Sequence, residues 1–363
     1  MPERLNQIQG IRALAMLGIF FAHTTMWLPD TLHAYVPLIL KLGRSGVAAF
    51  FILSGFLLSY KQTEVPKLNF WKAVKAAWKK VSKMYVLYIL TIVVCLIFNL
   101  PPSAHDWLIQ SIFLIFHITL TQDFIPFAAL INAFNAPAWF LSALFGIWIL
   151  LYMFPNAVNA MLRFSPGKCV VAIIALFAIQ VVWLICVRYG ISAILPQRYL
   201  AWCHDWLVYN NPILCLSEYC VGVLVGRFCV QRQYSVTVQN ILSAVAVLVS
   251  LLYVINYFTI RIDTSMSDMV IAECLVTLGL IAIMSSDSIG YKIMSIRSIV
   301  WFGNVSGYFF IIHTAVLFSM KTIYTYVPKP WLILLSLVMC VLLSALADYL
   351  YRCKNILKTN ENI

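Results

Sequence analysis

Long apolar stretches alternate with short polar connections along almost the whole chain. A bilayer core needs about 20 apolar residues per helix. Runs that approach or exceed this length occur at 11–28, 37–59, 84–100, 138–154, 169–187, 212–230, 239–258, 269–286, 299–320 and 331–350. The pattern therefore predicts ten transmembrane helices. The third and fourth runs are short and prolines interrupt the region between them, so nine or eleven spans remain open.

The composition supports the same class of protein. Hydrophobic residues make up 63% of the chain and charged residues only 10%, which leaves too little polar surface for a soluble globule. No internal repeat and no segment as large as a soluble domain is visible. We therefore expect an all-α polytopic integral membrane protein, with one transmembrane domain over 1–354 and a short cytoplasmic tail over 355–363.

The basic residues are distributed unevenly between the connections. With ten spans and a cytoplasmic N-terminus, most of the 25 Lys and Arg residues fall on the inner side, above all in the Lys-rich stretch 61–83. Because cytoplasmic loops carry an excess of Lys and Arg, this bias predicts that both termini are cytoplasmic. The net charge of +12 then has a natural partner in anionic lipid headgroups, and we expect no nucleic-acid partner.

Arg12 and His23 are the ionisable residues of the first apolar run. Eleven residues at about 100° each return to within roughly 20° of the same direction and rise ~16 Å, so both lie on one helix face. In a span over 11–28, Arg12 would lie at the mouth and His23 at depth. Ionisable groups in a membrane are costly and often functional. His23 is either a general base or a packing histidine, and Arg12 either guides a donor or anchors the helix to headgroups.

Two further patterns carry polar groups to defined helix faces. Lys79, Lys80 and Lys83 form a basic stripe that suits either the phosphates of a nucleotide-bearing thioester or lipid headgroups. Glu218 begins a row with Gly222 and Gly226, whose missing side chains permit close approach of another helix. The carboxylate on that face is expected to pair with Arg12, His23 or a substrate.

Several remaining polar and aromatic groups have both a functional and a structural interpretation. The segments 101–137 and 188–211 mix aromatic rings with amide and charged groups, which suits either a sugar site or an interfacial aromatic belt. His313, which follows Tyr308 in one apolar run, is either a cavity residue or a structural hydrogen-bond partner. The ten cysteines are scattered and include no CxxC, so we expect neither a metal site nor a disulfide framework.

Two motifs resemble the acyltransferase-3 family of membrane O-acyltransferases that modify bacterial surface glycans. Arg12 and His23 are similar to the family's Arg-x10-His signature, and 46–57, GVAAFFILSGFL, is similar to its Gly-Val-x-x-Phe-Phe-x-Leu-Ser-Gly-Phe run. Weaker matches follow in the same order along the chain: the stretch 137–144 with Trp139 and Ser142, Asn211-Pro212 with Glu218, and Trp301-Phe302-Gly303 with Tyr308 and His313. The resemblance covers nearly the entire chain.

The resemblance implies a specific reaction. An acyl group, most simply acetyl from acetyl-CoA, is transferred to a hydroxyl of a glycan or lipid-linked sugar in the bacterial inner membrane. His23 is the expected base and Arg12 its catalytic partner, without a metal. Acyl-CoA would bind at Lys79, Lys80 and Lys83, and the substrate cavity would include Trp139, Ser142, Glu218, Tyr308 and His313.

The chain departs from the family pattern at two places. Many members carry an acidic residue where this chain has Ala48, which leaves the partner of His23 undefined. The family's Arg-x-x-Arg aligns with Lys80-Val81-Ser82-Lys83, which keeps the charge but loses the planar guanidinium.

Two other functions remain open, and the oligomeric state is unknown. A glycan exporter or flippase would use the same polar residues for passage rather than for proton transfer. A sensory or assembly protein would need them only for packing.

Overall fold

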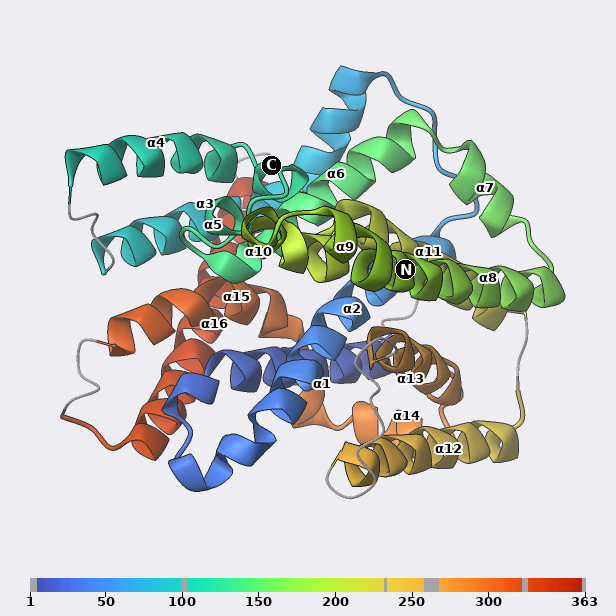
Figure 1. Ribbon diagram of the computed structural model, residues 1–363. Helices are drawn as coiled ribbons and strands as arrows, with labels where there is room; N and C mark the ends of the chain where they lie inside the picture. The colour runs from blue at the N-terminus through green and yellow to red at the C-terminus, as the bar shows by residue number, and fades with distance from the viewer. Residues whose placement is uncertain (1–4, 99–102, 232–233, 258–267, 322–325, 361–363) are drawn as a thin grey trace.

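The computed structural model describes residues 5–98, 103–231, 234–257, 268–321 and 326–360, and these residues form helices without any strand (Figure 1). The fold is an all-α polytopic membrane protein, as expected. The helices are α1 (Asn6–His23), α2 (Val36–Lys61), α3 (Phe70–Ile97), α4 (Ala104–Ile118), α5 (Ala128–Ile131), α6 (Trp139–Met153), α7 (Asn156–Leu162), α8 (Pro166–Ile185), α9 (Ser192–Ile194), α10 (Gln197–Asp205), α11 (Pro212–Gln231), α12 (Val236–Ile255), α13 (Asp268–Ala282), α14 (Ile289–Met294), α15 (Arg297–Met320) and α16 (Lys329–Asn360).

Eight helical segments in the described part of the chain are long and apolar enough to cross a membrane. They contain α2, α3, α6, α8, α11, α12, α15 and α16. The other two expected spans correspond to α1, which carries several polar residues, and to α13, whose 15 residues are short for a crossing. The number of ten spans therefore stays a prediction, and so does the boundary between a domain over 1–354 and a tail.

Glycines allow the central helices to pack closely around α2. A side chain at Gly222 of α11 would meet the Ile52 carbonyl of α2, and one at Gly55 would meet the Tyr219 carbonyl of α11. Gly46 lies in the same way against Ala15 of α1. The expected close packing of the glycine row in α11 is confirmed. Helix α1 in turn packs against α15, where Gly303 lies against the backbone of Gln9.

The outer helices present apolar side chains that no protein element covers. Val171 and Ile179 of α8 and Val247 and Leu251 of α12 are all more than half exposed. Both helices lie at the periphery in Figure 1. Because a soluble surface rarely carries such continuous apolar area, these faces are suited to lipid.

The first helix begins and ends earlier than the apolar run suggested. It extends from Asn6 to His23, and the amide of Thr24 donates to the carbonyls of Phe20 and Phe21 at its C-terminus. Two 3-10 turns, Thr25–Trp27 and Asp30–Tyr35, then lead into α2. Arg12 lies within the helix and His23 is its last residue, and the expected depths of the two side chains in the membrane stay a prediction.

Candidate active site

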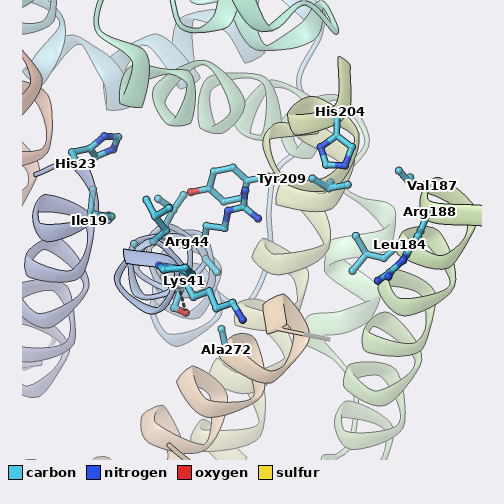
Figure 2. Close-up of a pocket in the computed structure, with 18 of the residues that line it drawn as sticks. Ile19, His23, Lys41, Arg44, Leu184, Val187, Arg188, His204, Tyr209 and Ala272 are labelled. Carbon is cyan, nitrogen blue, oxygen red and sulfur yellow. Dashed lines mark hydrogen bonds between the residues drawn. The ribbon is translucent and has the colours of Figure 1, made fainter. Parts of the chain in front are cut away.

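A cavity of about 700 Å³ opens beside His23, at the C-terminal end of α1 (Figure 2). Its walls come from α1, the first half of α2, the region around the end of α8, the end of α10 and α13. Figure 2 shows His23 at one side, His204 and Arg188 at the other, and Arg44 and Tyr209 between them. The His23 side chain is exposed to this cavity.

Two π-helical turns supply much of one wall. The turn Cys186–Ile191 carries Arg188 to the cavity, and the turn Trp206–Asn210 carries Tyr209. Trp183, just before the first turn, donates its indole N–H to the Leu207 carbonyl in the second at 2.8 Å. Because π-turns shift side chains out of the α-helical register and occur frequently at functional sites, they identify this wall as a specialised part of the fold.

The cavity is strongly cationic. Lys41, Arg44 and Arg188 line it together with His23 and His204, whereas the lining residues within the described ranges include no carboxylate. The Arg44 guanidinium lies 5.2 Å from the centre of the Tyr209 ring, and the Lys41 ammonium lies 5.5 Å from the Tyr253 and Tyr257 rings. Such cation-π contacts hold the Lys41 and Arg44 side chains against aromatic rings.

His313 of α15 is the immediate neighbour of His23, with 5.2 Å between the two ring centres. The Nδ1 atom of His313 lies 2.7 Å from the Phe310 carbonyl, which can only accept, so Nδ1 carries the proton. Its Nε2 atom is then an acceptor, and this buried atom has no hydrogen-bond partner in the described structure. Ala48 lines the same cavity with a methyl group. A second imidazole thus stands beside His23.

Arg12, about three turns before His23 within α1, occupies a closed environment. Its Nη1 atom donates to Gln9 Oε1 at 3.3 Å, its guanidinium carbon lies 5.9 Å from the centre of the Phe50 ring, and Gly307 of α15 lies beside it. Arg12 is half-buried and does not line the cavity. The guanidinium is therefore held by protein contacts on several sides.

An aromatic layer separates Arg12 from the two histidines. Phe50 contacts Phe140 and Phe310 at ring-centre distances of 6.0 and 6.1 Å, and Phe140 contacts Phe310 at 5.3 Å. On the far side, Phe310 lies 5.9 Å from His313. These rings therefore connect the surroundings of Arg12 to those of His313, and only His23 of the two signature residues lines the cavity.

The basic stripe of α3 is divided between two faces of the helix. Lys79 and Lys83 are exposed, whereas Lys80 is half-buried. The Lys80 ammonium lies 4.9 Å from the centre of the Trp148 ring and 5.5 Å from that of Tyr152, both in α6. Of the three, Lys80 alone makes these contacts with α6.

The other expected cavity residues lie around the site rather than in its lining. Trp139 packs edge-on against Tyr209, with 5.1 Å between ring centres, and so supports the cavity wall. Ser142 is fully buried, donates to the Leu120 carbonyl at 2.8 Å and accepts from the Asp123 amide at 3.4 Å. Tyr308 is half-buried and interacts electrostatically with Asp348 and Arg352 of α16.

Glu218 is buried behind the cavity and interacts electrostatically with Glu273 of α13 and with Tyr209. Gln180 of α8 donates through Nε2 to Glu273 Oε2 at 3.1 Å. The sequence had suggested Arg12 or His23 as a partner for Glu218, and among the described residues neither forms an ion pair with it. Ala272 lines the cavity next to Glu273 in the chain, so the two carboxyls belong to the layer behind it.

Asp123, in the turn Gln122–Phe124, is a buried acid outside the membrane-spanning segments. Both carboxyl oxygens lack a hydrogen-bond partner among the described residues, although Trp206 donates to its backbone carbonyl at 2.7 Å. Burial raises the pKa of Asp123 well above its usual value.

Sequence reasoning missed Lys41 and Arg44 as cavity residues and counted them only as outer basic residues. Arg188, His204 and Tyr209 were noted within an aromatic segment but not joined to His23. Their separation in the chain gives no periodic signal, because the cavity forms only when α2 packs beside the two π-turns.

Comparison with known proteins agrees with the motifs. A family model described as an acyltransferase domain, the acyltransferase-3 family, matches residues 5–349. The acyltransferase MdmB of Streptomyces mycarofaciens is 27% identical over 158 residues, which cover 40% of this chain and 38% of that protein. No solved structure matches. The chain belongs to the acyltransferase-3 family.

Proposed function

We propose that this protein is a membrane O-acyltransferase of the bacterial inner membrane that moves an acetyl group from acetyl-CoA to a hydroxyl of a glycan or lipid-linked sugar. Membership of the acyltransferase-3 family supports acyl transfer in general. The observation that carries the finer proposal is the placement of His23 in a cationic cavity with His313 beside it. A histidine that is both accessible and flanked by an acceptor nitrogen is equipped for general base catalysis.

The two histidines have different roles in the proton transfer. The free Nε2 atom of His313 accepts an N–H from His23 through one bridging water, which fixes the tautomer of His23. The other nitrogen of His23 then takes the proton of the acceptor hydroxyl. His313 thereby fills the orienting role that an acidic residue at Ala48 would serve.

The bond changes follow from this proton transfer. The acceptor oxygen attacks the thioester carbonyl as its proton passes to His23, and a tetrahedral intermediate forms. The intermediate collapses with cleavage of the carbon–sulfur bond, which leaves an ester on the sugar. The His23 imidazolium returns the proton to the departing sulfur, so the products are the acetylated acceptor and free coenzyme A.

In the proposed topology the donor enters from the cytoplasmic side, at the Lys-rich end of α3. Lys80 is the basic residue of the stripe that faces α6, and we assign it the closest contact with the donor phosphates, with Lys79 and Lys83 around it. Arg12 lies beyond it, on the near side of the aromatic layer of Phe50, Phe140 and Phe310. The thioester must pass this layer to reach His23.

A vesicle assay with purified protein tests the proposal. Labelled acetyl-CoA is supplied on one side together with a lipid-linked sugar, and release of coenzyme A and acetyl label on the sugar are both measured. We expect one acetylated sugar per coenzyme A released, and loss of both signals in His23→Ala. Movement of the sugar across the vesicle without thioester consumption would replace this proposal with an exporter.

A further inference from the structure

We propose that a binding site for a monovalent metal cation lies in the protein layer behind the cavity, formed by Gln180, Glu218, Glu273 and Thr277. The side chains come from three helices, α8, α11 and α13. The sequence predicted no metal site, because these groups lie in distant segments and include no Cys or His at short spacing. The site is separate from the reacting groups, so the inference goes beyond the proposed function and does not depend on it.

Hydrogen bonds from Gln180 of α8 reach both of the other helices. Its Nε2 atom donates to Glu273 Oε2 at 3.1 Å and to Ser217 Oγ of α11 at 3.2 Å. Both hydrogens of the amide are thereby used, and the remaining atom Oε1 can only accept. The Gln180 side chain is therefore held between α11 and α13 with one acceptor oxygen left over.

Three buried oxygen atoms of this cluster have no hydrogen-bond partner in the described structure, namely Gln180 Oε1, Glu273 Oε1 and Thr277 Oγ1. Thr277 lies four residues after Glu273 in α13, so the hydroxyl and the carboxyl share one face of that helix. Each of the three side chains is more than nine-tenths buried. Because an unsatisfied buried polar atom is costly, three of them together indicate a ligand that they share.

The cluster also concentrates acidic groups. Glu218 of α11 is buried and interacts electrostatically with Glu273. Among the described residues, no basic side chain forms an ion pair with either carboxyl. Two buried carboxylates repel each other unless a proton or a metal cation compensates their charge.

The number and type of the oxygens favour a metal cation over a shared proton. A proton between the two carboxyls would satisfy one oxygen of each and leave Gln180 Oε1 and Thr277 Oγ1 without a partner. A cation can contact all of these oxygens at once. They are fewer than the about six to eight oxygens that Ca²⁺ takes, and Mg²⁺ gives up its waters reluctantly. A monovalent ion such as Na⁺ therefore suits this dry site best.

The position of the site connects the cation to the cavity wall. Gln180 lies one turn before Leu184 in α8, and Glu273 directly follows Ala272 in α13. Leu184 and Ala272 both line the cavity (Figure 2). A bound cation therefore holds α8, α11 and α13 together directly behind this wall.

Thermal unfolding of the purified full chain in phosphatidylcholine vesicles tests the site without any turnover. The probe is Na⁺, which replaces choline at constant chloride so that the ionic strength does not change. We expect the melting temperature to rise with the Na⁺ concentration and then to saturate, because a ligand that binds only the folded state stabilises it by mass action. Equilibrium dialysis with radiolabelled Na⁺ should show saturable binding in the same concentration range.

Matched variants separate the site from general effects on folding. Glu273→Gln nearly keeps the shape of the side chain but removes its charge, so it should abolish the Na⁺-dependent rise in melting temperature. Thr277→Val replaces only a hydroxyl and should raise the half-saturating Na⁺ concentration several-fold. The control is Ser336→Ala, which removes a buried hydroxyl of α16 that also lacks a hydrogen-bond partner in the described structure and should keep the wild-type response. If Glu273→Gln does not fold, Thr277→Val carries the same test.

Three results would overturn the proposal. Equal melting temperatures of the wild type in Na⁺ and in choline would show that the two carboxyls hold only a proton. A Na⁺ response that is unchanged in Glu273→Gln and in Thr277→Val would place the ion elsewhere. Stabilisation by Ca²⁺ but not by Na⁺ would show a divalent site. None of these results depends on acyl transfer, so the cation site and the transferase proposal can fail separately.

Discussion

Arg12, within α1, and His23, at the open C-terminal end of α1, are the two residues of the family signature and lie in different surroundings. Arg12 is enclosed by Gln9, Phe50 and Gly307, whereas His23 opens into the cationic cavity. One helix thus presents a charge that protein contacts hold in place and an imidazole that a ligand can reach. The difference indicates that two residues of one motif can have different roles. We infer that the enclosed Arg12 positions the donor and that His23 at the open end performs the chemistry.

Substitution of His23 should lower kcat more than any other substitution. It tests the assignment of the chemistry to the open end of α1. Without a general base, His23→Ala should lose about 10³-fold in kcat, within the range that proton transfer contributes. His33→Ala is the control, because His33 is exposed in the turn Asp30–Tyr35 and contacts Asp30. Coenzyme A release coupled to acetylated product measures both variants. Comparable rates for the two would break the assignment of chemistry to this end.

His313 should be the next most sensitive position. His313→Gln should lower kcat by about tenfold to a hundredfold while KM for both substrates stays close to wild type, because His313 orients His23 and touches no substrate. Introducing Glu at Ala48, where many family members are acidic, should restore part of the rate in His313→Gln. A rise in KM with unchanged kcat would contradict the positioning role.

Arg12 should affect the reaction through the donor. Arg12→Gln should raise KM for acetyl-CoA by about tenfold, since the variant loses a charge-assisted contact, and kcat should change less. Arg12→Lys should fall between wild type and Arg12→Gln. Steady-state kinetics at fixed acceptor concentration measures the split. A fall in kcat equal to that of His23→Ala would show that Arg12 and His23 do not have separate roles.

The lysine stripe allows a finer test of the enclosed side. Lys80→Gln should raise KM for acetyl-CoA several-fold, and more than Lys79→Gln or Lys83→Gln, because only Lys80 faces α6. The effect should shrink at high salt. Equal effects of the three substitutions would favour a diffuse patch for lipid headgroups.

The smallest predicted effect is on thermal stability and concerns Asp123. Burial raises the pKa of Asp123 above the value of about 4 that it has in the unfolded chain. Between these two pKa values the folded state binds more protons than the unfolded state does. The stability of the wild type therefore falls as pH rises through this range. Asp123→Asn removes this dependence. The variant should exceed wild type in melting temperature at pH 8 by more than at pH 5. A parallel shift at both pH values would contradict the account.

The sequence predicted the all-α membrane class and the close packing of Gly222 and Gly226, because hydropathy and small-residue spacing are local signals. It predicted that Arg12 and His23 share a helix face, whereas the polar start and the earlier end of α1 were not predicted. The neighbour of His23 was not predicted. His313 lies in a distant helix, and only the packing of α15 against α1 brings the rings together.

The cationic cavity could not be predicted for a related reason. Lys41 and Arg44 are one turn apart, but Arg188 and Tyr209 reach them through π-turns, which have no simple hydropathy signature. Positive charge near a membrane surface also has a general explanation in lipid headgroups. Only the three-dimensional arrangement distinguishes basic residues that line a cavity from basic residues that merely follow the charge bias of membrane loops.

Chemical rescue tests the central claim, that His23 is the base at the open end, most directly. His23→Gly leaves room for free imidazole in a cavity that already opens beside it. We predict that imidazole restores acetyl transfer by His23→Gly in proportion to its concentration, and that it restores nothing in Arg12→Gln. Transfer by His23→Gly at the wild-type rate without imidazole would contradict the account.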